Sequence, residues 1–199
     1  MSKQVYISAD YAADSGDRNV VEILNGWAAD PKKALSFVDM AKVVSGSVSK
    51  NSDCRICDLK AEFNRQINAS SAVIFVVGDK TACRTAGSKC DRNNEGIYCT
   101  CTPYKHNTNG ERACKIFRTF PPSERNVGYI NKYSYLRHEF EQAKKAGKRI
   151  IIVYNSLREE RTWLPSYMQG YEHIARPFWK RDIWNNKVGD YQFIKEALS

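Results

Sequence analysis

The sequence predicts an α/β fold, in which helices cover both faces of a parallel β-sheet. Strand-like and helix-like segments alternate along the chain, which is the pattern of βαβ units. The apolar runs at residues 72–77 and 149–154 show no polar alternation, as is typical of strands buried on both faces. A helix-like segment at 134–147 leads directly into the second of these runs, which forms half of a βαβ unit.

Composition is consistent with one domain spanning residues 1–199. A chain of 199 residues with 42% hydrophobic residues can build one sizeable core and leaves little room for a second domain. No apolar run approaches the roughly 20 residues that cross a bilayer, and the first residues lack a signal-peptide pattern. We therefore expect a cytoplasmic protein with no membrane partner. The net charge of +9 favours anionic partners, but Lys and Arg are dispersed, so we do not expect nucleic acid to be one of them.

The first third of the chain predicts strand, helix and strand. Residues 4–8 form a short apolar run that ends in a polar turn, and a helix begins around 14–17. Asp30 and Pro31 end this helix, and residues 34–38 form the second strand candidate. The apolar stripe of the helix consists of Val20, Leu24, Trp27 and Ala28.

A Gly/Ser/Lys-rich loop at 44–52 separates the second strand from the next predicted helix. Asp58 can cap that helix, and residues 72–77 then form the clearest buried strand, closed by Gly78 and Asp79. The stripe of this second helix is Leu59, Phe63 and Ile67.

The helix predicted at 134–147 is the best defined. Ser134 can cap its start, and a glycine at position 147 suits its end. Its apolar stripe is Leu136, Phe140 and Ala143. Beyond the strand at 149–154, residues 158–168 are predicted to be helical apart from Pro165. A weak strand at 173–178 and a last helix near 190–198 follow.

Two glutamates on the 134–147 helix differ in their surroundings. Glu141 has cations at helical spacing and is interpreted as a surface ion-pair residue. Glu139 has no cation at these offsets and lies at the border of the apolar stripe. The pattern alone favours a solvated glutamate stabilised by the positive end of the helix dipole.

The predicted topology places Glu139 near a ligand-binding edge. In parallel sheets ligands bind beyond the carboxyl ends of the strands, and a helix that follows a strand begins at that edge. The other segments expected there are Ser8-Ala-Asp-Tyr11, Asp39 and Gly78-Asp79. The chain contains no G-x-G-x-x-G motif and no P-loop, so a bound nucleotide would not be held by a glycine-rich phosphate cradle.

In these segments the chain resembles a Toll/interleukin-1 receptor (TIR)-like domain of the bacterial branch, in the style of the TIR components of Thoeris anti-phage systems. The resemblance covers most of residues 3–81 and 133–160 and depends on the order and spacing of its motifs. Those motifs are Val5-Tyr-Ile-Ser8 with Asp10-Tyr11, Phe37-Val-Asp39, Ala72-Val-Ile-Phe-Val-Val-Gly-Asp-Lys-Thr81, Tyr135-Leu-Arg-His-Glu139 and Gly147-Lys-Arg-Ile-Ile-Ile-Val153.

The resemblance implies a flavodoxin-like fold and an enzyme that cleaves NAD at the nicotinamide–ribose bond. The catalytic glutamate of the family falls on Glu139, which reverses the preference for a solvated residue. NAD is then a substrate, and the product is ADP-ribose or a cyclic or conjugated nucleotide that signals to a downstream effector in immunity. Self-association is expected as well. The candidates to line the site are Ser8, Asp10, Tyr11, Asp39 and Tyr135.

The chain departs from the family between Thr81 and Tyr133, where relatives have a short connection and this chain has about fifty residues. This predicted insertion, residues 82–132, enters just before the helix that carries Glu139. It contains Cys83, Cys90, Cys99, Cys101 and Cys114, and Cys54 and Cys57 lie in what is predicted to be the preceding loop. A zinc site is one interpretation, with His106 also available, and reduced cysteines packing a small satellite core are another. Disulfides are less favoured in a cytoplasmic protein.

Two further functions stay open. One is a non-catalytic TIR-type assembly or adaptor module, which would self-associate and leave NAD intact. The other is a nucleoside deoxyribosyltransferase-like enzyme, which shares the flavodoxin-like fold and a ribose-facing glutamate.

The aromatic residues Trp163, Trp179 and Trp184 are interpreted as core or subunit-contact residues.

Overall fold

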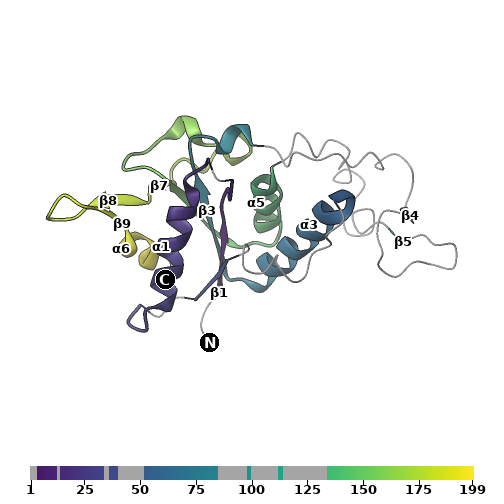
Figure 1. Ribbon diagram of the computed structural model, residues 1–199, viewed down its shortest axis with the longest axis horizontal. Coiled ribbons are helices and arrows are strands. Elements are labelled where there is room, and N and C mark those ends of the chain that lie inside the picture. Colours follow the sequence, from purple (N-terminus) through teal and green to yellow (C-terminus); the bar gives the residue numbers. More distant parts are fainter. Residues whose placement is uncertain are drawn as a thin grey trace.

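The protein is a three-layer α/β structure, seen here in a computed structural model (Figure 1). The structure describes residues 4–12, 14–33, 36–39, 52–84, 98–99, 112–113 and 134–199. None of the helices in these ranges combines the length and the apolar character that a membrane-spanning helix needs.

A five-stranded, wholly parallel sheet forms the middle layer, with the strand order β2-β1-β3-β6-β7. Counted along the sheet strands this is the order 2-1-3-4-5, which is characteristic of flavodoxin-like folds. The prediction of a parallel α/β sheet is therefore confirmed. The strands are β1 (Gln4–Ser8), β2 (Ser36–Asp39), β3 (Ala72–Val77), β6 (Arg149–Tyr154) and β7 (Arg176–Pro177).

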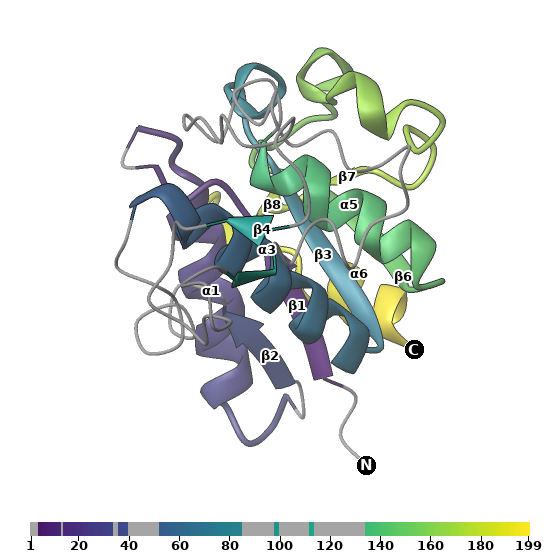
Figure 2. The same ribbon diagram turned by 90° about the vertical axis from the view of Figure 1, so that its right-hand side faces the viewer.

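Helices lie on both faces of the sheet. Figure 1 shows α1 (Asp17–Ala29) and α6 (Tyr191–Leu198) on one side, and Figure 2 looks onto α3 (Ser52–Ala69) and α5 (Tyr135–Lys145) on the other. All six residues of β3 are buried, and they alternate between the two cores. This confirms the expectation that the apolar run at 72–77 is covered on both faces.

The helix α5 is built as its sequence predicts. The Ser134 side chain accepts a hydrogen bond of 3.0 Å from the backbone N–H of Arg137, which caps the first turn. Gly147 has a φ of 61°, a left-handed conformation that an L side chain would strain, and the chain turns there into β6.

Some predicted boundaries were wrong. The second predicted helix begins at Ser52 rather than at Asp58, so Cys54 and Cys57 belong to α3 and not to a loop. The predicted helix at 158–168 is two short 3₁₀ turns, because Pro165 lacks the N–H that a continuous helix would need. These turns are η5 (Arg161–Trp163) and η6 (Ser166–Met168), and η1 (Thr81–Cys83) follows β3.

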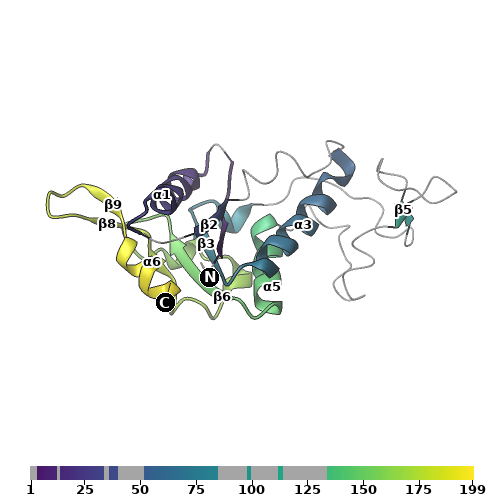
Figure 3. The same ribbon diagram turned by 90° about the horizontal axis from the view of Figure 1, so that it is seen from below.

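Two small antiparallel pairs were not predicted. One joins β8 (Trp179–Arg181) to β9 (Lys187–Gly189), and it projects from the body of the molecule in Figure 3. The other joins β4 (Tyr98–Cys99) to β5 (Arg112–Ala113). The rest of the predicted insertion and most of the loop at 44–52 lie outside the described residues.

Candidate active site

The site begins with the burial of Glu139 in α5. Phe140 and Ala143 on the same helix are fully buried against the sheet, and the Phe140 ring packs edge-on against Phe75 of β3 at 5.3 Å. These contacts fix the rotation of α5 about its axis. As a result Glu139 is only 4% exposed, and the interpretation of a solvated surface glutamate was wrong.

Two hydroxyl groups from β1 bind the two oxygens of the Glu139 carboxylate. The Tyr6 Oη donates a hydrogen bond of 2.7 Å to Oε1, and the Ser8 Oγ donates a second one to Oε2. Tyr6 and Ser8 are two residues apart on one strand, so their side chains point to the same face of the sheet. The carboxylate therefore lies at the carboxyl end of β1, on the α3–α5 face.

Burial dominates the electrostatics of this group. Loss of solvent raises the pKa of Glu139 to about 7, although the hydrogen bonds from Ser8 and Tyr6 act in the opposite direction. Burial, together with the neighbouring carboxylate, raises the pKa of Tyr6 well above its ordinary value, so the phenol keeps its proton and stays a donor. The site thus holds a carboxyl group that changes charge near neutral pH.

The position of Glu139 in the topology is that of a ligand site. The strand β1 lies between β2 and β3, and the chain leaves β1 for α1 on one face and reaches α5 on the other. In the 2-1-3-4-5 order this β1/β3 boundary is the switch point at which ligands bind.

The loop after β1 is joined to the segment after β3 by ion pairs. Asp10 binds Arg84 at 2.5 Å and also accepts a 3.0 Å hydrogen bond from the backbone N–H of Ala12. Asp14 binds both Arg84 and Lys80, the latter at 2.9 Å, and these cations lower the pKa of Asp14 to about 2. Asp10, predicted to line the site, is thus turned toward Arg84.

The remaining predicted lining residues have other surroundings. Tyr11 packs against the core on the α1–α6 face, and Tyr135 packs edge-on against Phe63 of α3 with ring centroids 5.6 Å apart. Asp39 ends β2 beside Ile7 of β1, and its side chain lies outside the described part of the structure. The structure brings Ser8 to Glu139, and it places Asp10, Tyr11 and Tyr135 in these other contacts.

Tyr6 was not predicted to belong to the candidate site, although it binds Glu139. A tyrosine in a short apolar strand reads as a core aromatic, and Tyr6 is indeed fully buried. The available signal was its spacing, since it stands two residues before Ser8 and must share its face.

A second buried carboxyl group, Asp17, was also missed. It is the first residue of α1, is fully buried, and accepts a 3.0 Å hydrogen bond from the Asn155 side chain at the end of β6. The side-chain oxygen of Asn155 in turn accepts a hydrogen bond of 2.7 Å from the indole N–H of Trp179. Burial raises the pKa of Asp17 to about 7, against the effect of the Asn155 hydrogen bond. In the sequence this aspartate was indistinguishable from an ordinary helix-start residue.

Gly78 makes room for the Asp17 carboxylate. A Cβ at position 78 would lie 2.7 Å from Asp17 Oδ1, closer than such atoms approach in proteins. The glycine that closes β3 is therefore required by close packing at the carboxyl edge of the sheet.

No metal centre is present among the described residues, because no group of three His, Cys, Asp or Glu side chains there is arranged to hold an ion. Cys83 is an exposed free thiol. The side chains of Cys54, Cys57 and Cys99, and all of Cys90, Cys101, His106 and Cys114, lie outside the described part of the chain. The zinc interpretation stays a prediction.

Comparison with known proteins adds no family assignment. No protein-family model matches this chain, and no curated protein matches it.

Proposed function

We propose that this protein is a TIR-like enzyme that cleaves the bond between nicotinamide and ribose in NAD, with Glu139 as the catalytic carboxylate. The observation that supports this most is the pair of hydroxyl donors on a buried carboxylate at the β1/β3 switch point. A ribose also presents hydroxyl groups, so it can bind the carboxylate as Ser8 does in the free protein.

We propose that substrate binds by replacing one of the two hydroxyl donors on the Glu139 carboxylate. A ribose hydroxyl takes the place of the Ser8 hydroxyl on Oε2, while Tyr6, which is fully buried, keeps its bond to Oε1. The Ser8 segment then has to shift, since Ser8 is itself only 1% exposed. The ion pairs of Asp10 and Asp14 with Arg84 hold the loop that follows Ser8 and resist that shift.

The chemistry needs an ionised carboxylate and no general acid. When the C1′–N bond breaks, its electron pair goes to the pyridinium nitrogen, and nicotinamide leaves as a neutral molecule. The ribose becomes an oxocarbenium-like cation, which the Glu139 carboxylate stabilises through space in a site without water screening. Water then attacks C1′ and releases a proton, giving ADP-ribose.

Other products follow from the same intermediate. Attack by another atom of the bound nucleotide gives a cyclic product, and attack by a second molecule gives a conjugate. We propose that such a product is the signal that reaches a downstream effector in bacterial anti-phage immunity, made by a self-associating protein in the cytoplasm. The 82–132 segment, directly before α5 in the chain, is the proposed place for control of acceptor choice or activation.

The test is to incubate the full chain with NAD and identify products by mass spectrometry, with and without extract from infected cells. A parallel reaction contains a deoxynucleoside and a different free base. We expect nicotinamide and an ADP-ribose-derived product from NAD and no exchange of bases. Base exchange with intact NAD would assign the site to deoxyribosyl transfer. If both substrates remain intact while the protein self-associates, the non-catalytic module is the correct function.

A further inference from the structure

The β8–β9 hairpin displays two large apolar side chains at its tip. Ile183 is 87% exposed and Trp184 is 75% exposed, and they are neighbours in the turn. The hairpin projects away from the sheet and its helices (Figures 1 and 3). Two adjacent apolar side chains at a projecting tip differ from single exposed residues scattered over a surface, which need no explanation.

Hydrogen bonds hold this tip in one conformation. One Asp182 side-chain oxygen accepts from the backbone N–H groups of Trp184, at 2.9 Å, and Asn186, at 2.8 Å. The backbone closes the turn with bonds of 3.0 Å from Asp182 to Asn186 and from Asn185 to Asp182. Asn185 adopts the left-handed φ of 66° that asparagine tolerates. Ile183 and Trp184 are thus presented without further ordering of the turn, which favours their use as binding anchors.

Arg181 and Lys187 flank the tip, whose one carboxylate, Asp182, accepts the backbone hydrogen bonds of the turn. Arg181 binds the backbone carbonyl of Asn185 at 2.8 Å, and Lys187 lies 4.3 Å from the centre of the Trp179 ring. Among the described residues no carboxylate is within ion-pair distance of either cation. Lys180 differs, because it is paired with Asp190 at 2.8 Å.

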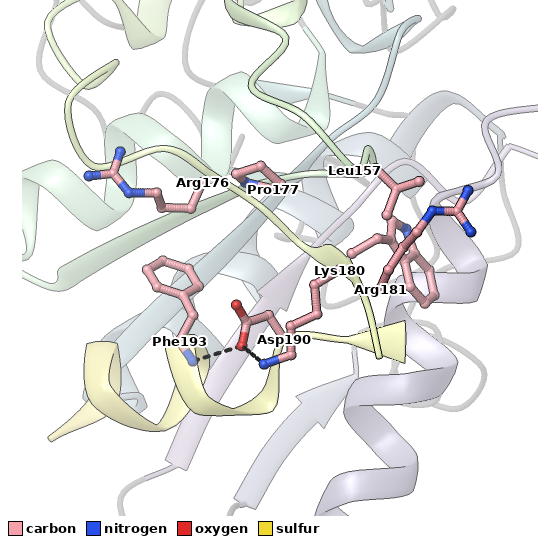
Figure 4. A pocket seen from close by; sticks show the side chains of 8 residues that line it. Leu157, Arg176, Pro177, Lys180, Arg181, Asp190 and Phe193 are labelled. Atoms are coloured by element: carbon pink, nitrogen blue, oxygen red, sulfur yellow. Dashed lines mark hydrogen bonds and ion pairs between the residues drawn. The ribbon is translucent and has the colours of Figure 1, made fainter. Parts of the chain in front are cut away.

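A pocket of about 470 Å³ lies at the base of the hairpin (Figure 4). The hairpin strand β8 forms one wall, Leu157 and Pro177 contribute apolar surface, and Phe193 of α6 lies opposite. Three cations line this pocket, but Lys180 pairs with Asp190 at 2.8 Å and Arg176 pairs with Glu159 at 3.5 Å. Arg181 is therefore the lining cation that has no carboxylate partner among the described residues. Because Trp179 and Phe193 belong to the core of the α1–α6 face, the pocket is separated by the sheet from the Glu139 site.

We propose that the hairpin tip and the pocket at its base together bind an acidic polypeptide segment of a partner protein. An apolar side chain of the segment fills the pocket between Leu157 and Phe193. The carboxylates of the segment pair with Arg181 and Lys187, and Trp184 packs against the segment. Charge selects this occupant. A second copy of this chain would bring an equally basic surface against the first, in a protein with a net charge of +9. An anionic bilayer could receive the tip but could not fill the concave pocket beside it.

The test uses synthetic peptides and the full chain. One peptide of about twelve residues alternates Glu with Leu, and its partner replaces every Glu by Lys. Binding is measured by fluorescence anisotropy. We expect the acidic peptide alone to bind, with an affinity that falls at least roughly tenfold between about 0.05 and 0.5 M salt. The charge-reversal variant Arg181→Glu/Lys187→Glu and the variant Trp184→Ala should each weaken binding by roughly tenfold or more.

The matched control is Lys144→Glu/Lys145→Glu, which makes the same change in net charge on the end of α5, on the other face of the sheet. It should keep most of the affinity, and thermal melts should show all variants folded. Equal loss in the control would reduce the effect to net charge and overturn the proposal. Failure of the acidic peptide to bind would also overturn the proposal. That holds whether the tip is then found to bind phosphatidylserine vesicles, to mediate self-association, or to do neither.

Discussion

Tyr6 and Glu139 are 133 residues apart in the chain, yet their side chains form a buried hydrogen bond of 2.7 Å. The bond joins the first strand to the fifth residue of α5. It also defines what is special about Glu139, a carboxylate that is enclosed by the core but supplied with donors. These donors, and the close packing of Gly78 against Asp17 at the same edge of the sheet, have consequences that can be measured.

Tyr6→Phe should shift the pH dependence of nicotinamide release to higher pH. The phenol stabilises the ionised carboxylate, and a hydrogen bond to a charged group is worth about 1.5–3 kcal/mol. Its loss should raise the pKa of Glu139 by roughly one to two units above the present value of about 7. The rate of nicotinamide release should thus fall most below about pH 7 and recover in alkaline buffer. An unchanged pH profile would show that Tyr6 does not act on the carboxylate.

Ser8→Ala should behave differently from Tyr6→Phe, because a ribose hydroxyl is proposed to replace Ser8. In the free protein the carboxylate loses a donor, so the pH midpoint of kcat/KM should rise. In the substrate complex the ribose supplies the donor, so the midpoint of kcat should stay where it is in the unaltered protein. The two profiles are measured over the range of about pH 5 to 9. A parallel shift of both midpoints would contradict the proposed exchange of donors.

Glu139→Gln should stabilise the fold at alkaline pH. Burial raises the pKa of Glu139 from 4.5 to about 7, so between these values the folded protein holds a proton that the unfolded chain has released. The free energy of unfolding therefore falls as pH rises through this window, by about 3 kcal/mol from this group. Glu139→Gln cannot ionise, so it removes this loss of stability.

This effect is measured by urea unfolding at pH 5 and pH 8. The gain from Glu139→Gln should be on the order of 1–3 kcal/mol at pH 8 and much smaller at pH 5. Asp17 has the same sign of shift and contributes to the background slope, so the comparison is made between variants at each pH. A gain that does not change with pH would mean that ionisation of Glu139 carries no cost in the folded protein.

Gly78→Ala should destabilise the protein, whereas Gly26→Ala should not. A Cβ at position 78 would meet Asp17 Oδ1 at 2.7 Å, and both groups are held by the sheet and α1. We expect a loss of about 1–3 kcal/mol. Gly26 lies inside α1 with nothing within 4 Å of its Cβ position, so alanine there should gain about 0.5–1 kcal/mol. Thermal melts compare the two variants, and similar losses at both positions would refute the packing argument.

The fold was predictable because its strands are strongly patterned. The run 72–77 has no polar residue and is buried throughout, and the helix at 134–147 has a clear stripe with a Ser134 cap. Boundaries were less predictable where polar residues lead a helix, as in α3, whose first turn begins six residues before Asp58. The β8–β9 hairpin has only three residues in each strand, too few for a period of two to be recognised.

The candidate site was predictable only in part, because its decisive contacts are non-local. Sequence spacing placed Glu139 at the border of the buried face, and the topology placed it near Ser8. The sequence could not show that both carboxylate oxygens accept hydrogen bonds from hydroxyl groups of β1, nor that Asp17 is buried against Gly78 and Asn155. Those facts depend on how α1, α5 and β6 pack around the sheet.

The most direct test of the central claim compares nicotinamide release from NAD by the unaltered protein, Glu139→Gln and Glu141→Gln under identical conditions. Glu141 lies on the same helix, half-exposed beside Lys144, so its substitution controls for the loss of one acid from α5. We expect Glu139→Gln, with its fold intact by circular dichroism, to lose at least roughly 1000-fold of the activity, while Glu141→Gln retains it. Equal activity in the folded Glu139→Gln variant and the unaltered protein would show that Glu139 is not the catalytic carboxylate.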